Sequence, residues 1–239
     1  MVAEMFVVSR RFCGRPQWAH GGYVCGRLAK HLPGPTAVRL RAPPPFEVEL
    51  RIEISEDRTQ LLQGSTLIAE ARRAELDLTP PPAPSFAEAE KASKSYVGFT
   101  HHSFPECFVC GTQRADGDGM RIFPGLIEAR SIVAAPWVPD ASLAEGSSSV
   151  RTEFLWATLD CVGAIALETL VWRPLFPGKY WLTGELSARI DGSITPGEKC
   201  VVIGWPLQID GRKCFAGSAV FSESGHPVAV GRSIWFQEK

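Results

Sequence analysis

Residues 152–172 read TEFLWATLDCVGAIALETLVW, a stretch in which apolar residues fall on nearly every face of a helix. This pattern predicts a helix that is buried on all sides rather than one that lies on a surface. Such a helix would be roughly 30 Å long, about the width of a small domain. Glu153, Asp160 and Glu168 interrupt it. A carboxylate in the middle of an apolar helix is costly to bury unless it is paired or used. Asp160 is therefore the principal candidate for a functional residue.

Two other interpretations of this stretch deserve comparison. Its length would allow a transmembrane span. The central acid, the absence of a basic flank and the lack of a second such segment argue against a membrane helix. The alternative role for Asp160 is that of a structural acceptor, bonded to backbone amides or to an arginine, and the sequence leaves that alternative open.

The composition bounds the class of protein. The chain has 239 residues, 45% of them apolar and 21% charged, with a net charge of −1. These values are typical of a globular protein with one large domain or two small ones. The scattered basic residues predict neither a nucleic-acid nor a membrane partner. Seven cysteines without a secretory signal favour reduced thiols, and hence a cytoplasmic location.

The order of predicted elements suggests one unit used twice. In the first half, a helix within residues 12–32 is ended by prolines and followed by strands at 37–41, 46–54 and 60–76. The sequence TPPPAP at 79–84 predicts a stiff connection. We divide the chain into an N-terminal unit at 1–90, a linker at 91–106 and a C-terminal unit at 107–239.

The second half repeats this order. The 152–172 helix is followed by four predicted strands, which we expect to form an antiparallel meander with a hairpin turn at Asp210-Gly211. The predicted strands lie at 130–138, before the helix, and at 181–190, 199–207, 212–222 and 227–236, after it. The fold class is therefore α+β, with a sheet wrapped around a buried helix in each half.

Three motifs carry a family resemblance. HGGYVCGRLAKHL at 20–32 and FLWATLDCVGAIALETL at 154–170 resemble the hotdog-fold acyl-CoA thioesterases, and most nearly the double-hotdog, acyl-CoA thioesterase II type. CFVCGTQRADGDGMRIF at 107–123 is similar to the Cys-x-x-Cys-Gly lead-in of single-hotdog thioesterases related to the phenylacetate-pathway enzymes. The resemblance implies a double hotdog, with two antiparallel sheets that each wrap a long central helix. It also implies an acyl-CoA or acyl-carrier thioester as substrate, no cofactor, and a homodimer or larger assembly.

The resemblance also implies a composite catalytic site between the two halves. Asp160 would activate water or attack the thioester directly. The amides of Gly22 and Tyr23, at a helix start, would polarise the thioester carbonyl. Thr183 matches a strand threonine that assists the aspartate. His20, Gly21 and Trp156 are expected to bind substrate, although His20 could instead only brace its turn.

The positions at which the sequence departs from the family pattern suggest alternatives to a complete thioesterase site. Ala29 stands where a complete first half would carry an acid, and residues 151–153 lack a Gly-Gly pair, which predicts one site per chain. The expected glutamine position falls at or near Trp235, and Gln237 is the nearest candidate. Without that glutamine the protein could be a non-catalytic acyl-ligand binder. A hotdog hydratase or dehydratase would use an Asp–His or Asn–His pair, and the 152–172 helix has no histidine.

Cysteines and tryptophans provide the remaining candidates. Cys107 and Cys110, with His101 and His102 nearby, have the spacing of one zinc-ligand pair. A structural zinc site needs four ligands and no second pair has a matching spacing, so we expect no metal. Four tryptophans are expected either in the core or along an acyl tunnel, and the sequence does not separate the two; they are Trp156, Trp181, Trp205 and Trp235.

Overall fold

The central helix begins at Thr152, as predicted. The computed structural model describes residues 2–176, 178 and 180–238, and in it helix α3 spans Thr152–Leu167. A π-helical turn, Glu168–Trp172, and the short α4, Arg173–Leu175, continue it. Among the described residues, this is the one continuous helix long and apolar enough to cross a membrane, and 78% of its most apolar window is buried inside the protein. It is the core helix of the fold.

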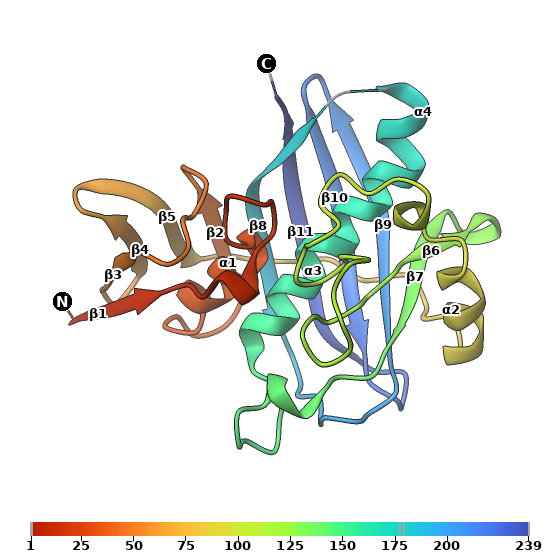
Figure 1. Cartoon of the computed structure of the whole chain (residues 1–239), viewed down its shortest axis with the longest axis horizontal. Helices are drawn as coiled ribbons and strands as arrows, with labels where there is room; N and C mark the ends of the chain where they lie inside the picture. Colours follow the sequence, from red (N-terminus) through yellow and green to blue (C-terminus); the bar gives the residue numbers. More distant parts are fainter. Residues whose placement is uncertain (1, 177, 179, 239) are drawn as a thin grey trace.

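Eleven strands form one continuous antiparallel sheet, in the order β1-β3-β4-β5-β2-β8-β11-β10-β9-β7-β6 (Figure 1). The first half contributes β1 Val2–Val7, β2 Thr36–Leu40, β3 Glu49–Ile54, β4 Arg58–Gln63 and β5 Thr66–Arg73. The second half contributes β6 Gly125–Ile127, β7 Ile132–Trp137, β8 Trp181–Ile190, β9 Cys200–Asp210, β10 Lys213–Phe221 and β11 Pro227–Gln237. The halves join where β2 pairs with β8 and Val38 lies opposite Leu186. The two predicted sheets are thus the two parts of a single sheet.

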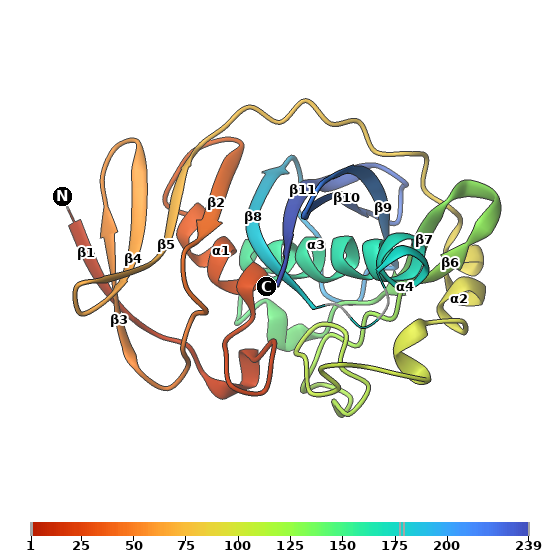
Figure 2. The same ribbon diagram turned by 90° about the horizontal axis from the view of Figure 1, so that it is seen from above.

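The second-half strands curve over α3 (Figure 2). β9, β10 and β11 form the predicted meander, and Gly211 supplies the positive φ of 56° that the β9–β10 turn requires. The first of the four strands departs from the prediction, because β8 pairs with β11 instead of β9. In the first half, Gly64 has a φ of 58° and lies in the turn that separates β4 from β5. Residues 60–73 therefore form two strands joined by a turn, and not one strand with a bulge.

The helix of the first half is short. α1 spans Gly21–Ala29, nine residues, so the expectation of a long central helix holds only for the second half. α1 lies against α3 with the two backbones in close approach. A Cβ on Gly22 would lie 2.5 Å from the Asp160 Cβ, and one on Gly26 would lie 2.4 Å from the Glu153 Cα. These two glycines let the helices cross antiparallel and bring the N-terminus of α1 to the middle of α3.

The segment that connects the two halves lies earlier in the sequence than predicted. Residues 74–85 carry no helix or strand and run from β5 over the sheet to α2, Phe86–Ser93 (Figure 2). α2 begins with a capping box between Ser85 and Glu88. Its fully buried Ala89 lies in a hydrophobic cluster with second-half residues such as Ile203. α2 therefore belongs to the second half, and the boundary placed at residue 90 moves to residues 74–85.

Candidate active site

Asp160 lies where the two halves meet. Its Oδ2 accepts a hydrogen bond from the Gly22 N–H at 2.8 Å, and its Oδ1 accepts one from the Thr183 hydroxyl at 3.0 Å. Gly22 belongs to the first turn of α1 and Thr183 to β8. The predicted meeting of the Gly-Gly helix start with the Asp160 carboxylate is therefore present, and one chain supplies both sides.

Burial dominates the electrostatics of the Asp160 carboxylate. The residue is 5% exposed, and burial raises the pKa of its carboxyl, although His20 and the hydrogen bonds from Gly22 and Thr183 oppose this. Among the described residues, no arginine or lysine forms an ion pair with it. A carboxylate of raised pKa at a cavity wall is a stronger base than an exposed one.

A cavity of about 1220 Å³ opens beside this carboxylate. Aromatic side chains line one part of it: Tyr96, Phe104, Trp172, Phe176, Trp181 and Trp235. The Trp172 and Trp181 rings are stacked with their centroids 5.0 Å apart, and Trp235 meets Trp172 edge-on at 5.5 Å. Of the four tryptophans that the sequence left unassigned, Trp181 and Trp235 line the cavity. Trp172, which the sequence reasoning did not single out, joins them.

Arginines line another part of the cavity. Arg39 pairs with Glu185 at 2.8 Å, Arg41 pairs with Glu70, and Arg173 pairs with Glu168 at 3.1 Å. Arg15 differs from these three, because it has no carboxylate partner among the described residues. Its guanidinium donates to the Trp181 carbonyl at 3.1 Å and lies over the Phe104 ring, 4.9 Å from the centroid. Arg15 is therefore the cavity arginine with charge to offer an anionic ligand.

The structure changes the assignment of the amides that were expected to polarise the substrate carbonyl. The Gly22 N–H is already bonded to Asp160, and the Tyr23 N–H donates to His20 Nδ1 at 3.3 Å. Neither amide is available to a substrate carbonyl in this arrangement. The Gly21 N–H, one residue earlier, makes no hydrogen bond to the part of the chain that the structure describes. Gly21 also lines the cavity, so its amide, the first of α1, is the candidate donor to a ligand.

His20 braces its turn. Its Nδ1 is the N-cap acceptor of α1, its Nε2 lies 3.0 Å from the Cys161 Sγ, and the residue is only 2% exposed. Burial lowers the pKa of His20, but the hydrogen bond to Cys107 and the Asp160 charge outweigh it, so the pKa is raised overall. Nδ1 is 3.8 Å from the Asp160 Oδ2. The His20 Nδ1 accepts from the Tyr23 N–H and its Nε2 faces Cys161, so both ring nitrogens are occupied by protein groups. The approach of His20 to Asp160 therefore does not form the Asp–His pair of a hydratase.

His20 lines the cavity, whereas two other sequence candidates lie away from it. Trp156, expected to bind substrate, is buried in the α1–α3 contact, where its carbonyl would be 2.8 Å from a Cβ on Gly22. It does not line the cavity, because its position on α3 faces the first-half helix. Gln237 pairs with Trp181 in the β8–β11 ladder and does not line the cavity either. No glutamine is found among the described cavity residues.

Three thiols meet beside His20, a grouping that the sequence did not reveal. The Cys161 Sγ lies 3.6 Å from the Sγ atoms of both Cys107 and Cys110. Hydrogen bonds from Cys110 and Cys161 hold the pKa of Cys107 well below its ordinary value, and hydrogen bonds to Cys107 raise the pKa values of the other two. Only the Cys107–Cys110 spacing was visible in the sequence. Cys161 is 51 residues or more away from both.

The two histidines suspected as zinc partners are placed elsewhere. His102 bonds through Nε2 to the Cys110 carbonyl oxygen at 3.0 Å, and its Nδ1 accepts from the Phe104 N–H at 3.0 Å. His101 is exposed. Neither side chain joins the three thiols.

Comparisons with known proteins identify the fold. No protein-family model matches the chain, and no curated protein sequence matches it. A putative thioesterase II from Thermobifida fusca YX shares 14% identity, over 99% of this chain and 92% of that one, with a TM-score of 0.63. An acyl-CoA thioesterase II, TesB2, from Mycobacterium marinum shares 10% identity, over 99% and 93%, with a TM-score of 0.58.

A conserved protein of unknown function with a hot dog fold, from Alicyclobacillus acidocaldarius, shares 10% identity, over 99% of this chain and 93% of that one, with a TM-score of 0.54. At these identities the likeness establishes architecture. Each of the three structures is matched across nearly its whole length, so both halves of this chain are covered. The chain is a double-hotdog α+β protein, with both halves in one polypeptide.

Proposed function

We propose that this protein hydrolyses an acyl thioester, with acyl-CoA as the first substrate to test. The observation that carries the proposal is the Asp160 carboxylate, which is buried at the wall of a large cavity and bonded to both halves through Gly22 and Thr183. A buried carboxylate with two oriented hydrogen bonds and a raised pKa suits general-base or nucleophilic work. The fold shared with proteins described as thioesterases supports the same chemistry by analogy.

The chemistry can follow either of two routes. In the first, Asp160 takes a proton from water, the hydroxyl oxygen attacks the carbonyl carbon, and the C–S bond breaks to release the thiol. In the second, an Asp160 oxygen attacks the carbonyl carbon, the C–S bond breaks to expel the thiolate, and an anhydride forms. Water then opens the anhydride, which releases the carboxylic acid and frees Asp160, and the thiolate takes up a proton from this water. In both routes negative charge grows on the carbonyl oxygen, and the Gly21 N–H is the donor that we propose for it.

The cavity lining suggests how the substrate lies. The wall formed by Trp172, Trp181 and Trp235 is apolar and suits the acyl group. Arg15, which has no carboxylate partner among the described residues, suits a phosphate of the CoA moiety, since a guanidinium binds phosphate through charged hydrogen bonds. Its guanidinium is held against the Trp181 carbonyl, so it lies near the aromatic wall.

Hydrolysis is tested directly with a panel of acyl-CoA thioesters of increasing chain length, both straight and aromatic. Turnover is followed by chromatographic separation of free CoA, because the seven protein thiols interfere with thiol reagents. We expect release of CoA above the uncatalysed rate for at least one chain length. Binding without turnover across the panel would overturn the hydrolase proposal.

A binding function without catalysis is the second candidate. The observation in its favour is that no glutamine is among the described cavity residues, although the family resemblance implies one at or near Trp235 to orient water. Tight, saturable binding of acyl-CoA with no turnover would establish it. The cytoplasmic location and the assembly into a homodimer or larger oligomer stay predictions.

Replacing Arg15 by alanine is expected to raise KM for acyl-CoA about tenfold and to leave kcat nearly unchanged. The guanidinium would bind a phosphate of the CoA moiety and take no part in bond breaking, and a charged hydrogen bond contributes roughly 1.5–3 kcal/mol. Steady-state kinetics with the best substrate of the panel measure both constants. The matched control is Arg58→Ala, an exposed arginine on β4 that does not line the cavity. An equal effect of both substitutions would remove Arg15 from the binding site.

A further inference from the structure

The three thiols and the neighbouring imidazole form a compact, buried group of metal-binding donors. His20, Cys107, Cys110 and Cys161 are between 2% and 8% exposed. One donor atom from each of His20, Cys107 and Cys161 lies within 4.8 Å of the others, and Cys110 lies 3.6 Å from Cys161 through sulfur. We propose that these four residues bind one Zn²⁺ ion in a tetrahedral Cys₃His site. This inference stands independently of the proposed hydrolase activity.

The donor spacing fits tetrahedral zinc. With Zn–S bonds of about 2.3 Å, two thiolates on a tetrahedron are roughly 3.8 Å apart. Both sulfur pairs that include Cys161 are 3.6 Å apart. The His20 Nε2 lies 3.0 Å from the Cys161 Sγ, where roughly 3.5 Å is expected for a nitrogen and a sulfur on the same zinc ion. Cys110 lies outside the set of donors that are all within 4.8 Å of one another, so its side chain must move to complete the site. Three soft thiolates with one imidazole favour zinc over magnesium or calcium.

The loop that carries two of the ligands is fixed by backbone contacts. The Gly111 N–H donates to the Cys107 carbonyl at 2.9 Å, and a Cβ on Gly111 would lie 2.4 Å from that oxygen. Between the two cysteines, the Phe108 carbonyl accepts from the Met120 N–H at 2.8 Å, and the Val109 carbonyl accepts from the Ile122 N–H at 2.9 Å. The Cys-x-x-Cys-Gly segment is thus a tight turn braced by residues 120–122.

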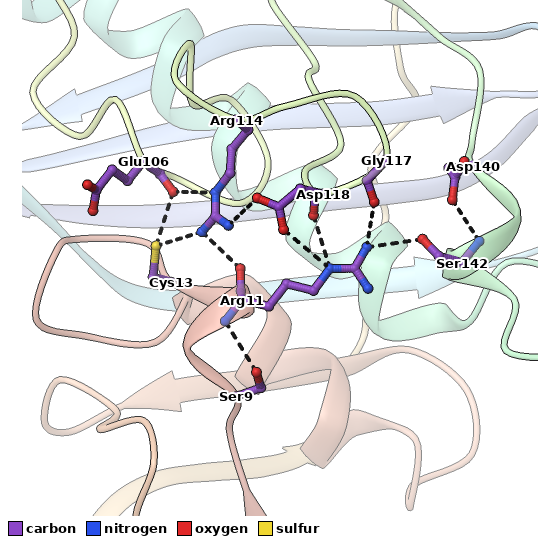
Figure 3. A network of polar contacts seen from close by, with 9 residues as sticks. All are labelled: Ser9, Arg11, Cys13, Glu106, Arg114, Gly117, Asp118, Asp140 and Ser142. Atoms are coloured by element: carbon purple, nitrogen blue, oxygen red, sulfur yellow. Dashed lines mark hydrogen bonds and ion pairs between the residues drawn. The ribbon is translucent and has the colours of Figure 1, made fainter.

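A polar network attaches this loop to the turn that precedes His20 (Figure 3). Arg114 donates to the carbonyl oxygens of Glu106 and Arg11, at 2.8 and 3.0 Å, and to the Cys13 Sγ at 3.0 Å. The Phe108 N–H donates to the Cys13 carbonyl at 2.9 Å. These contacts hold the segment before His20 against the 107–110 loop, so the approach of these two ligand segments does not depend on metal alone.

Ordinary burial of thiols does not account for the grouping. The other cysteines, Cys13, Cys25, Cys200 and Cys214, are also free and buried, and no two of them are recorded in contact with each other in the described structure. Among the described residues, the place where three thiols from two distant segments contact one another is beside His20. A metal there replaces protons that the thiols would otherwise hold, and it compensates for burying their charge.

The four ligands would leave no open coordination position, so the proposed zinc is structural. Its ligands lie next to the candidate active site, because Cys161 follows Asp160 and His20 precedes Gly21 in the sequence. When Nε2 binds the metal, the ring proton moves to Nδ1, which is 3.8 Å from the Asp160 Oδ2. The Tyr23 N–H then loses its contact with Nδ1, and His20 joins the metal to the carboxylate.

The test is the metal content of the full chain, purified under reducing conditions without added chelator. Elemental analysis is expected to give about one zinc per chain. Cys110→Ala and Cys161→Ala should each reduce the zinc content at least tenfold, while the matched control Cys200→Ala, a buried cysteine on β9, should retain it. Zinc retained by both cluster variants, or a zinc-free protein that takes up none from added ZnCl₂, would overturn the proposal.

X-ray absorption at the zinc edge of the unmodified protein keeps the test decisive if the variants do not fold. Three sulfur ligands and one nitrogen ligand are expected. A shell of only nitrogen and oxygen would contradict the site, as would a disulfide among Cys107, Cys110 and Cys161 in freshly purified, reduced protein. Cobalt substitution adds a second readout, because a tetrahedral thiolate site gives intense sulfur-to-metal charge-transfer bands that an oxygen site does not.

Discussion

Replacing Asp160 by asparagine is expected to lower kcat by about 10²–10⁴-fold, the range in which a general acid–base group contributes. Asparagine keeps the shape of the side chain, and its amide oxygen can still accept the Gly22 N–H. It cannot take a proton from water, and it is a poor nucleophile. Binding of a non-hydrolysable acyl-CoA analogue, measured by calorimetry, should change little, because the cavity wall is retained.

Controls separate this effect from a general loss of structure. Asp191→Asn changes an aspartate that pairs with Arg189 at the end of β8, outside the cavity, and should leave kcat unchanged. Thr183→Val removes the hydroxyl that donates to Asp160 at 3.0 Å and should lower kcat by a smaller factor, about tenfold, since the base remains but is less well oriented. An Asp160→Asn variant with normal kcat would place the catalytic base elsewhere.

Replacing Gly22 by alanine is expected to lower the free energy of unfolding by about 2–3 kcal/mol. The added Cβ would lie 2.5 Å from the Asp160 Cβ and 2.8 Å from the Trp156 carbonyl oxygen, so α1 and α3 would have to separate. The gain in helix propensity on replacing glycine, about 1 kcal/mol at most, offsets only part of this cost. Urea denaturation followed by circular dichroism measures the change.

The matched control for this substitution is Gly64→Ala. Gly64 has a φ of 58° in an exposed turn, and nothing lies within 4 Å of its would-be Cβ. Only the left-handed backbone conformation opposes alanine there, at a cost of roughly 1–2 kcal/mol. A Gly22→Ala variant as stable as the unmodified protein would show that the helices are not in the close contact described.

Much of the fold could be predicted because its elements have strong local patterns. The apolar stretch gave the start of α3 at Thr152, and β8 has the predicted bounds, Trp181–Ile190. α2, Phe86–Ser93, forms from a polar segment rich in helix-forming residues. The N-terminal strand β1, Val2–Val7, was not predicted, because that short segment gains its place only by pairing with β3.

The site could be predicted only in part, because its chemistry depends on contacts between distant residues. The position of Asp160 on an apolar helix identified the carboxylate. A helix start shows that amides are unpaired, but it does not show which side chains accept from them, and here Asp160 and His20 occupy those of Gly22 and Tyr23. Cys161 is likewise unremarkable in sequence, although it is the residue that links the Cys107–Cys110 pair to His20.

The segment at residues 74–85 connects the two halves in one polypeptide, and this has an evolutionary consequence. Two identical hotdog subunits related by a twofold axis must present every feature twice. Joining them in one polypeptide removes that requirement, so each copy can accept mutations that the other does not share. Here one copy contributes a helix of nine residues that begins with Gly-Gly, and the other contributes a helix of sixteen that carries the acid. Ala29 stands in the first copy where the family resemblance would place an acid, and the Arg151–Glu153 ion pair of the second copy lies where that resemblance would place Gly-Gly.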